Sequence, residues 1–284
     1  GYVAGLVLDA LMRSQLGTPH EDPLQLTAYF LKFLEQGPFE VHVRALRRGS
    51  AFTNLSATLV QKAEQKVTTL AIFGVLTPSS RDERNVTVAP PSRFAAPFPL
   101  YTHPSQCAKV TETPRWDFLP LLQITRDPHY AKIFAKQGPS MQLGHYFTLK
   151  NPADRVTTQS LPFFLDNYMS FAHVTLLRNK IDPYKSRPAT LAFSVEFKFP
   201  IPKQDSPHHS LRSVAVLNKG QFVNDPCARH ETYLEVWTAP TDVGDRNAGT
   251  EDWKHHQRCL AICHQTSMII PLATKKVKRS GPKL

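Results

Sequence analysis

Residues 1–13 read GYVAGLVLDALMR, a mostly apolar segment that opens the sequence. Val3, Leu6, Val7 and Leu11 recur at intervals of three and four, the spacing of one face of an α-helix. A Gly-Thr-Pro sequence at 17–19 follows as a stop signal. The pattern predicts a buried helix of about three turns.

Four segments with strand character follow this helix. Each alternates or runs apolar, is rich in aromatic and β-branched residues, and is bounded by turn signals. The four segments are Leu24–Leu34, Phe39–Arg47, Phe52–Gln61 and Lys66–Leu76. One helix followed by four antiparallel strands predicts an α+β unit.

The same order of elements recurs later in the chain. Residues 161–177, LPFFLDNYMSFAHVTLL, predict a second apolar helix, and strands again follow it. Pro23–Phe33 has its counterpart in Pro188–Phe199, and Leu70–Phe73 has its counterpart in Leu260–Cys263. Landmarks matched in the same order predict an internal repeat of two tandem units.

Three segments therefore organise the chain. Residues 1–77 form the first unit, and residues 138–284 form the second unit with a basic C-terminal tail. Between them, residues 78–137 are rich in proline, which excludes long regular elements from the first part of this segment. We expect a linker that wraps the surface.

The composition limits the classes of partner. Lys and Arg number 34 against 23 Asp and Glu, a net charge of +11 in 284 residues, which favours an anionic partner. The basic residues are scattered and form no known nucleic-acid motif, so nucleic acid is not expected. No run of 18 apolar residues exists, so no membrane span is expected.

Cysteine usage and the C-terminus bear on the compartment. Cys107, Cys227, Cys259 and Cys263 have irregular spacing and are interpreted as reduced thiols. We expect a cytoplasmic protein. The peroxisome is the alternative, because the C-terminal Pro282-Lys283-Leu284 differs from a Ser-Lys-Leu signal at its first position.

The repeat resembles the thioesterase-like superfamily of double-hotdog proteins, of which bacterial acyl-CoA thioesterase II is the best-known enzyme type. In the first half the resemblance rests on GYVAG at 1–5 and DPLQLTAYFLK at 22–32. In the second half it rests on FLDNY at 164–168, LEVW at 234–237 and LAICHQ at 260–265.

The resemblance implies an α+β double hotdog, in which each of two tandem units has a long helix wrapped by an antiparallel sheet. It implies acyl-CoA or a similar apolar thioester as the substrate, and a homo-oligomer that is a dimer or larger. Hotdog units begin with a strand before the helix, whereas this sequence opens at the helix itself. We therefore expect the first unit to lack its first strand.

The resemblance also implies a catalytic pair. In acyl-CoA thioesterase II, an Asp and a Gln at the positions of Asp166 and Gln265 hold the attacking water. Strand alternation places Gln265 on the same face as Cys263, where a polar amide needs a partner. The alternative is that Asp166 only caps a helix and Gln265 is an ordinary surface residue.

The third member of the family's site is a hydroxyl residue, which the resemblance places near Val214–Asn218. No Ser or Thr stands there, and Asn218 is the nearest polar side chain. Its amide either replaces the hydroxyl donor or belongs to the turn ahead of Lys219 and Gly220.

Other chemistries find less support. A segment with three imidazoles and two thiols lacks the paired spacing of a zinc site, so no metal is expected. Its members are His255, His256, Cys259, Cys263 and His264. No Gly-x-Ser-x-Gly elbow, dinucleotide fingerprint or phosphate loop is present, so neither a serine hydrolase nor a nucleotide cofactor is expected.

Three functions stay open at this point. The first is an acyl-CoA thioesterase-like hydrolase that cleaves a fatty or polyketide-derived thioester through water held by Asp166 and Gln265. The second is a tailoring enzyme of secondary metabolism, a lyase, cyclase or isomerase. The third is a non-catalytic protein that binds an acyl ligand.

Overall fold

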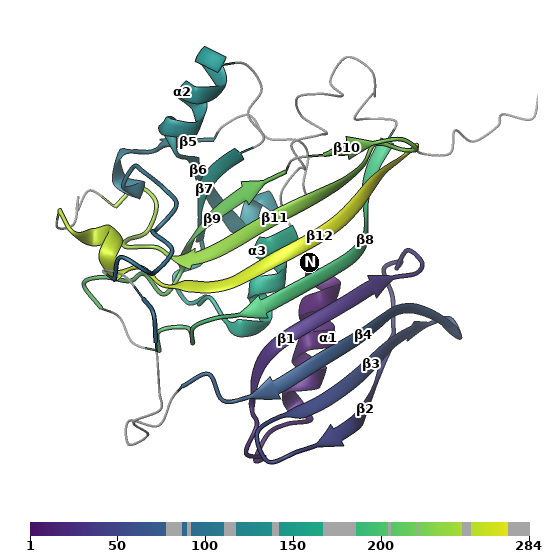
Figure 1. Ribbon diagram of the computed structural model, residues 1–284. Helices are drawn as coiled ribbons and strands as arrows, with labels where there is room; N and C mark the ends of the chain where they lie inside the picture. Colours follow the sequence, from purple (N-terminus) through teal and green to yellow (C-terminus); the bar gives the residue numbers. More distant parts are fainter. Residues whose placement is uncertain are drawn as a thin grey trace, which may run out of the picture.

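The protein is described by a computed structural model that covers most of the chain (Figure 1). The described residues are 1–77, 87–89, 92–110, 118–137, 142–166, 186–203, 206–220, 222–245 and 251–271. The elements below refer to these ranges.

The first unit consists of one helix and four strands, as its periodicity predicts. Its elements are α1 (Tyr2–Arg13), β1 (Asp22–Phe30), β2 (Glu40–Arg48), β3 (Thr53–Gln61) and β4 (Glu64–Gly74). Helix α1 buries one face, which includes Ala4, Val7, Leu8 and Leu11, against the sheet. Val7 and Leu11 of the predicted stripe belong to this buried face, whereas Val3 and Leu6 are only half-buried.

The second part of the chain contributes more strands than the first. Its strands are β5 (Ala108–Lys109), β6 (Leu122–Arg126), β7 (Gln142–Leu149), β8 (Ser186–Phe197), β9 (Ser213–Lys219), β10 (Val223–Asn224), β11 (Arg229–Thr238) and β12 (Cys259–Pro271). Its helices are α2 (Pro128–Gln137) and α3 (Leu161–Asp166), with short 3-10 turns at Pro104–Gln106, Leu119–Leu121, Thr158–Ser160 and Trp253–His256.

One continuous sheet carries both units. Among the described residues the strand order is β2-β3-β4-β1-β8-β12-β11-β9-β7-β6-β5, with β10 paired to β11. The units join where β1 and β8 pair antiparallel, from Gln25 opposite Glu196 to Tyr29 opposite Ala192. A hydrogen bond of 3.0 Å between the hydroxyls of Thr27 and Ser194 crosses this boundary. Counted outward from it, β4 and β12 hold equivalent positions, as do β2 and β9.

Helices α1 and α3 lie on the same face of the sheet, and the start of α1 lies close to α3 (Figure 1). Glycine makes this approach possible. A β-carbon on Gly1 would lie 2.5 Å from the carbonyl oxygen of Pro162, and one on Gly5 would lie 2.6 Å from that of Gln159. Pro162 lies in α3 and Gln159 in the 3-10 turn before it, so the two glycines let α1 pack closely against both.

The segment expected to be a linker is more ordered than its proline content predicts. It supplies β5, β6 and helix α2, and β6 pairs with β7 to extend the sheet. Phe98 and Leu100 from the same segment join a second buried cluster with Tyr146 and Trp237. Among the described residues of this segment, 87–89 and 92–103 contain no helix or strand, whereas α2 contacts β7 of the second unit. The domain boundaries at 77 and 137 stay a prediction.

Some expectations fall wholly or partly outside the described residues. The second helix, expected over 161–177, is described as α3 over Leu161–Asp166, and the remainder of its range lies outside. The basic C-terminal tail also lies outside, so the cytoplasmic location, with the peroxisome as alternative, stays a prediction. Within the described part of the chain, no helix has the length and apolarity needed to cross a membrane.

Candidate active site

Asp166 belongs to α3, and the packing of that helix fixes its position. A capping box between Thr157 and Ser160 starts the turn that leads into α3. Leu161, Phe164 and Leu165 are buried in the main core. The carboxylate of Asp166 is therefore held beside the core while its side chain stays 21% exposed.

Two side chains and the amino group of Gly1 meet at this carboxylate. The Gln265 amide on β12 donates one hydrogen bond to Oδ1 of Asp166 at 2.5 Å and another to Oγ1 of Thr190 at 2.7 Å. The Thr190 hydroxyl on β8 donates to Oδ1 of Asp166 at 3.0 Å. Each donor has one acceptor that fits it, so the three groups form a closed hydrogen-bonded network. The structure thus brings together the predicted pair and adds a threonine.

A β-bulge aims Thr190 toward the network. Ala192 pairs with Thr266 and Thr190 pairs with Ser267, so the intervening Leu191 has no partner on β12. Phe193 and Val195 face the core, and strict alternation from them would point Thr190 away from α3. The extra residue reverses this orientation, a frequent arrangement beside active sites.

The network keeps Asp166 ionised. Burial raises the pKa of this carboxyl, but the charged amino group of Gly1 and the hydrogen bonds from Thr190 and Gln265 outweigh burial, so that the pKa is lowered. Cys263 lies near Asp166, and its pKa is raised well above the ordinary value by burial first and by the Asp166 charge second. Cys263 is therefore a neutral thiol at neutral pH, not a nucleophilic thiolate.

A cavity of about 910 Å³ opens beside the network. Its lining is mostly apolar and comes from both units, through the start of α1, the residues after β1, and β8. The lining residues are Gly1, Tyr2, Val3, Phe30, Leu31, Lys32, Phe33, Leu34, Phe118, Leu121, Phe163, Asp166, Pro188, Ala189, Thr190, Leu191 and Ile270. Large, mostly apolar cavities with a few polar groups at one place are typical of ligand sites.

Asn218, the third predicted member, lies elsewhere. It is on β9, which β11 separates from β12, and its register partners are Leu234 and Leu143. Its side chain is 2% exposed, and its amide nitrogen has no hydrogen-bond partner. The hydroxyl that hydrogen-bonds to Asp166 and Gln265 belongs to Thr190. Sequence reasoning missed Thr190 because neither the bulge nor the pairing of β8 with β12 is visible in the strand pattern.

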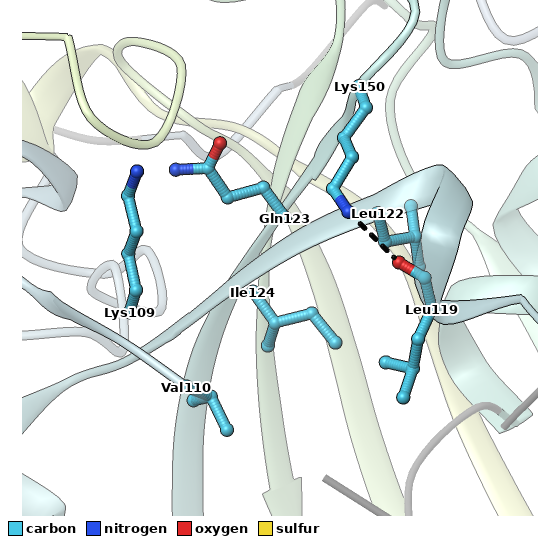
Figure 2. Close-up of a pocket in the computed structure, with 7 residues that line it drawn as sticks. All are labelled: Lys109, Val110, Leu119, Leu122, Gln123, Ile124 and Lys150. Carbon is cyan, nitrogen blue, oxygen red and sulfur yellow. Dashed lines mark hydrogen bonds between the residues drawn. The ribbon is translucent and has the colours of Figure 1, made fainter. Parts of the chain in front are cut away.

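A second hollow, of about 350 Å³, lies beside β6 (Figure 2). Lys109 and Gln123 extend to one side of it, whereas Val110 and Ile124 form an apolar side. Lys150 donates to the carbonyl oxygen of Leu119 at 3.3 Å. No carboxylate, hydroxyl or thiol belongs to its described lining, so it lacks the groups that thioester hydrolysis needs.

Comparisons with known proteins agree with this architecture. Residues 1–74 match the acyl-CoA thioesterase N-terminal domain family. Ustilagic acid biosynthesis cluster protein orf2 of Mycosarcoma maydis is 38% identical over 68 residues, which are 24% of this chain and 18% of that protein. The matched region thus spans less than a fifth of that relative's length.

Solved structures match nearly the whole chain. A protein with a hot dog fold from Alicyclobacillus acidocaldarius has a TM-score of 0.66 at 15% identity, over 95% of this chain and 86% of that one. Acyl-CoA thioesterase II TesB2 from Mycobacterium marinum has a TM-score of 0.60 at 16% identity, over 95% of this chain and 88% of that one. The chain therefore has an acyl-CoA thioesterase II-like hotdog fold, and its residues 1–74 match the acyl-CoA thioesterase N-terminal domain family.

Proposed function

We propose that the protein hydrolyses the thioester of an apolar acyl chain carried by coenzyme A. The observation that carries this proposal is the network of Asp166, Thr190 and Gln265 at the wall of the apolar cavity. The fold and the N-terminal family match support the reaction class. An apolar cavity that ends at an ionised carboxylate suits a substrate with an apolar chain and a reactive carbonyl.

In the proposed reaction, a water molecule binds beside the network and attacks the thioester carbonyl carbon. Asp166 accepts a proton from this water, while Gln265 and Thr190 fix the carboxylate and the water in place. The tetrahedral intermediate collapses with cleavage of the carbon–sulfur bond, and the proton held by Asp166 passes to the departing sulfur. The products are a carboxylic acid and the free thiol of the carrier.

The first turn of α1 is the proposed oxyanion site. The first N–H groups of a helix have no partner within the helix, and the positive end of the helix dipole lies there. Tyr2 and Val3 belong to the cavity lining at this end of α1. Donors aimed at the developing oxyanion stabilise the transition state more than the ground state.

Substitutions in the network test the proposal. Asp166→Asn, Gln265→Ala and Thr190→Val should each lower kcat for thioester hydrolysis by about 10²–10⁴, because each removes a group that activates or orients the water. Free thiol is measured with acyl-CoAs of several chain lengths. The melting temperatures should stay close to that of the parent, since the three side chains form little of the core.

Matched variants control for general effects of lost hydroxyls. Thr190→Ser keeps the hydroxyl and should recover most of the activity that Thr190→Val loses. Thr27→Val removes a hydrogen-bonded hydroxyl at the β1–β8 boundary, outside the network, and should leave activity unchanged. The assignment fails if the three network variants keep parental activity, or if the parent releases no thiol from any acyl-CoA.

A second candidate is a tailoring step in secondary metabolism. It draws support from the partial match to a protein of the ustilagic acid biosynthesis cluster. In that case the same cavity would hold a small apolar intermediate during a lyase, cyclase or isomerase reaction. Mass spectrometry separates the two, because hydrolysis adds one water across the thioester. A non-catalytic acyl-binding protein would bind the thioester and leave its mass unchanged.

We also propose that the protein assembles as a dimer or larger homo-oligomer. Support comes from the first unit, in which Tyr29 and Leu70 are about half exposed and β2 is a terminal strand of the described sheet. Exposed apolar groups and sheet edges favour association. Light scattering coupled to size exclusion tests this directly. A monomer of 32.0 kDa at all concentrations would contradict it.

A further inference from the structure

One basic side chain lines the apolar cavity, and a second stacks on an aromatic residue of the lining. Lys32 belongs to the lining, and so does its neighbour Phe33. The guanidinium carbon of Arg187 lies 3.5 Å from the centre of the Phe33 ring. Asp166 is the one carboxylate of the described lining, and it is engaged in the network.

Lys32 keeps an excess of positive charge although it forms an ion pair. Glu64 accepts hydrogen bonds from Lys32 at 2.8 Å and from Lys66 at 2.7 Å. These two lysines lower the pKa of Glu64 to about 2, so the carboxylate stays ionised. One negative charge thus faces two positive charges. The Lys66 side chain is 9% exposed and that of Lys32 is 55% exposed, so the excess charge is presented to solvent at Lys32.

The ring of Phe33 orients the Arg187 guanidinium, and this contact leaves the positive charge of Arg187 in place. Stacking on the ring engages the face of the guanidinium and leaves its N–H groups, which lie in the plane, available as donors. Within the described part of the chain, no carboxylate forms an ion pair with Arg187. A planar fork of donors held in this way suits a phosphate group.

We propose that Lys32 and Arg187 bind the phosphate that follows the pantetheine arm of the substrate's carrier. This inference rests on the proposed function, because it concerns the same cavity. The acyl chain and thioester occupy the apolar interior beside Asp166, the pantetheine arm passes out along Phe33, and its phosphate meets the two cations. That phosphate is common to coenzyme A and to the prosthetic arm of an acyl carrier protein.

Paired substrates with and without the phosphate test the proposal. Arg187→Gln and Lys32→Gln should each raise KM for an acyl-CoA by about tenfold with kcat unchanged, since uniform binding is lost and the chemical step is not touched. The same acyl group on N-acetylcysteamine has no phosphate, and its KM should not change. Arg44→Gln, an exposed arginine on β2, is the matched control and should alter neither. Equal losses for both thioesters, or no loss, would overturn the proposal.

A third substrate identifies which phosphate is bound. An acyl-4′-phosphopantetheine carries the shared phosphate without the nucleotide, and the variants should lose the same factor with it as with acyl-CoA. A loss confined to acyl-CoA would overturn the assignment in favour of the nucleotide phosphates. If the loss is shared, comparing acyl-CoA with the same acyl group on a carrier protein shows which source the parent enzyme prefers.

Binding measured without turnover separates this inference from the proposed function. Calorimetric titration of free coenzyme A into the parent and into Arg187→Gln needs no hydrolysis. About tenfold weaker binding to Arg187→Gln supports the phosphate site even if no thioester is cleaved. Equal affinities would overturn the site even if hydrolysis by the Asp166 network is established.

Discussion

The two units share one sheet but differ in what covers its outer face. In the first unit, Tyr29 and Leu70 on that face are 47% and 54% exposed. In the second unit, Tyr146 and Trp237 are 0% and 2% exposed, because Phe98 and other residues pack over them. The first unit is thus a helix against a sheet, whereas the second has an additional layer made from the segment between the units.

The same contrast appears in the equivalent strands β2 and β9. Along β2 every residue is at least partly exposed, while six of the seven residues of β9 are buried. The sequences differ accordingly, since β2 reads EVHVRALRR and β9 reads SVAVLNK. Alternation of apolar and charged residues indicates a strand covered on one face, and a continuous apolar run indicates a strand covered on both. The two halves of a repeat can therefore diverge through what packs on them.

The difference in covering between the two units predicts its largest effect on folding stability for a substitution of Trp237. Its ring meets Phe98 edge to face at 5.6 Å, and its indole N–H donates to Glu235 at 2.7 Å. Trp237→Ala should lower the free energy of unfolding by about 3–5 kcal/mol, because it leaves a cavity in the outer layer. Leu70→Ala on the first unit should change it by less than about 0.5 kcal/mol. Urea unfolding followed by circular dichroism compares them, and similar losses would refute the layered description.

Much of this fold could be predicted from the sequence, because its signals are local. The helix at α1 and the four strands after it follow from periodicity and turn residues within each segment. The extra layer could not be predicted, because Phe98 and Leu100 lie in a proline-rich segment with no period. Only their contacts with Tyr146 and Trp237, distant in sequence, show that they belong to a core.

The candidate site was predictable in part, for a related reason. Asp166 and Gln265 were found through family resemblance, near the start of the predicted second helix and in the last strand. Thr190 depends on a bulge and on the pairing of β8 with β12, two strands far apart in the chain. Asn218 was selected by its place in a strand pattern, which carries no information about the order of strands in the sheet.

A buried histidine in the second unit should make the folding stability of the protein fall at acid pH. His145 on β7 is fully buried, and burial together with the Arg126 charge lowers its pKa to about 3. At this side chain the unfolded chain therefore binds up to one more proton than the folded protein, at pH values above about 3 and below 6.5. Stability is retained above that pH and is lost as pH falls toward 3, by up to about 1.4 kcal/mol per pH unit.

A variant isolates the contribution of this histidine. His145→Gln keeps a polar side chain that does not titrate, so the slope of unfolding free energy against pH should decrease by one proton between pH 6 and about 4. Some slope should remain, because burial also lowers the pKa of His103, His209 and His230. Urea unfolding at each pH gives the slope. An unchanged slope would mean that His145 is protonated in the folded protein.

The inner face, unlike the outer one, joins the two units at α1 and α3. Gly5→Ala places a β-carbon 2.6 Å from the Gln159 carbonyl oxygen, so α1 has to move. We expect a net loss of about 1–3 kcal/mol, although alanine favours a helix. The proposed thioester hydrolysis should slow as well, because the start of α1 shifts away from Asp166. Ala10→Gly in the same helix should cost about 1 kcal/mol with activity retained.

The smallest expected effect on folding stability is that of a valine truncation in β2, which is compared with the equivalent truncation in β9. Val43 and Val216 both contact the main core from the fourth strand of their unit, but Val43 is half-buried and Val216 is 1% exposed. Val216→Ala should cost about 2 kcal/mol, since two buried methyl groups are removed and a cavity remains. Val43→Ala should cost less than about 1 kcal/mol, because solvent already reaches that side chain and fewer contacts are lost. Denaturant unfolding of the two variants gives the difference. If Val43→Ala costs as much as Val216→Ala, another part of the assembly covers β2. The measurement is then repeated at a lower protein concentration. A smaller cost of Val43→Ala at that concentration would identify the covering neighbour as a second copy of the chain.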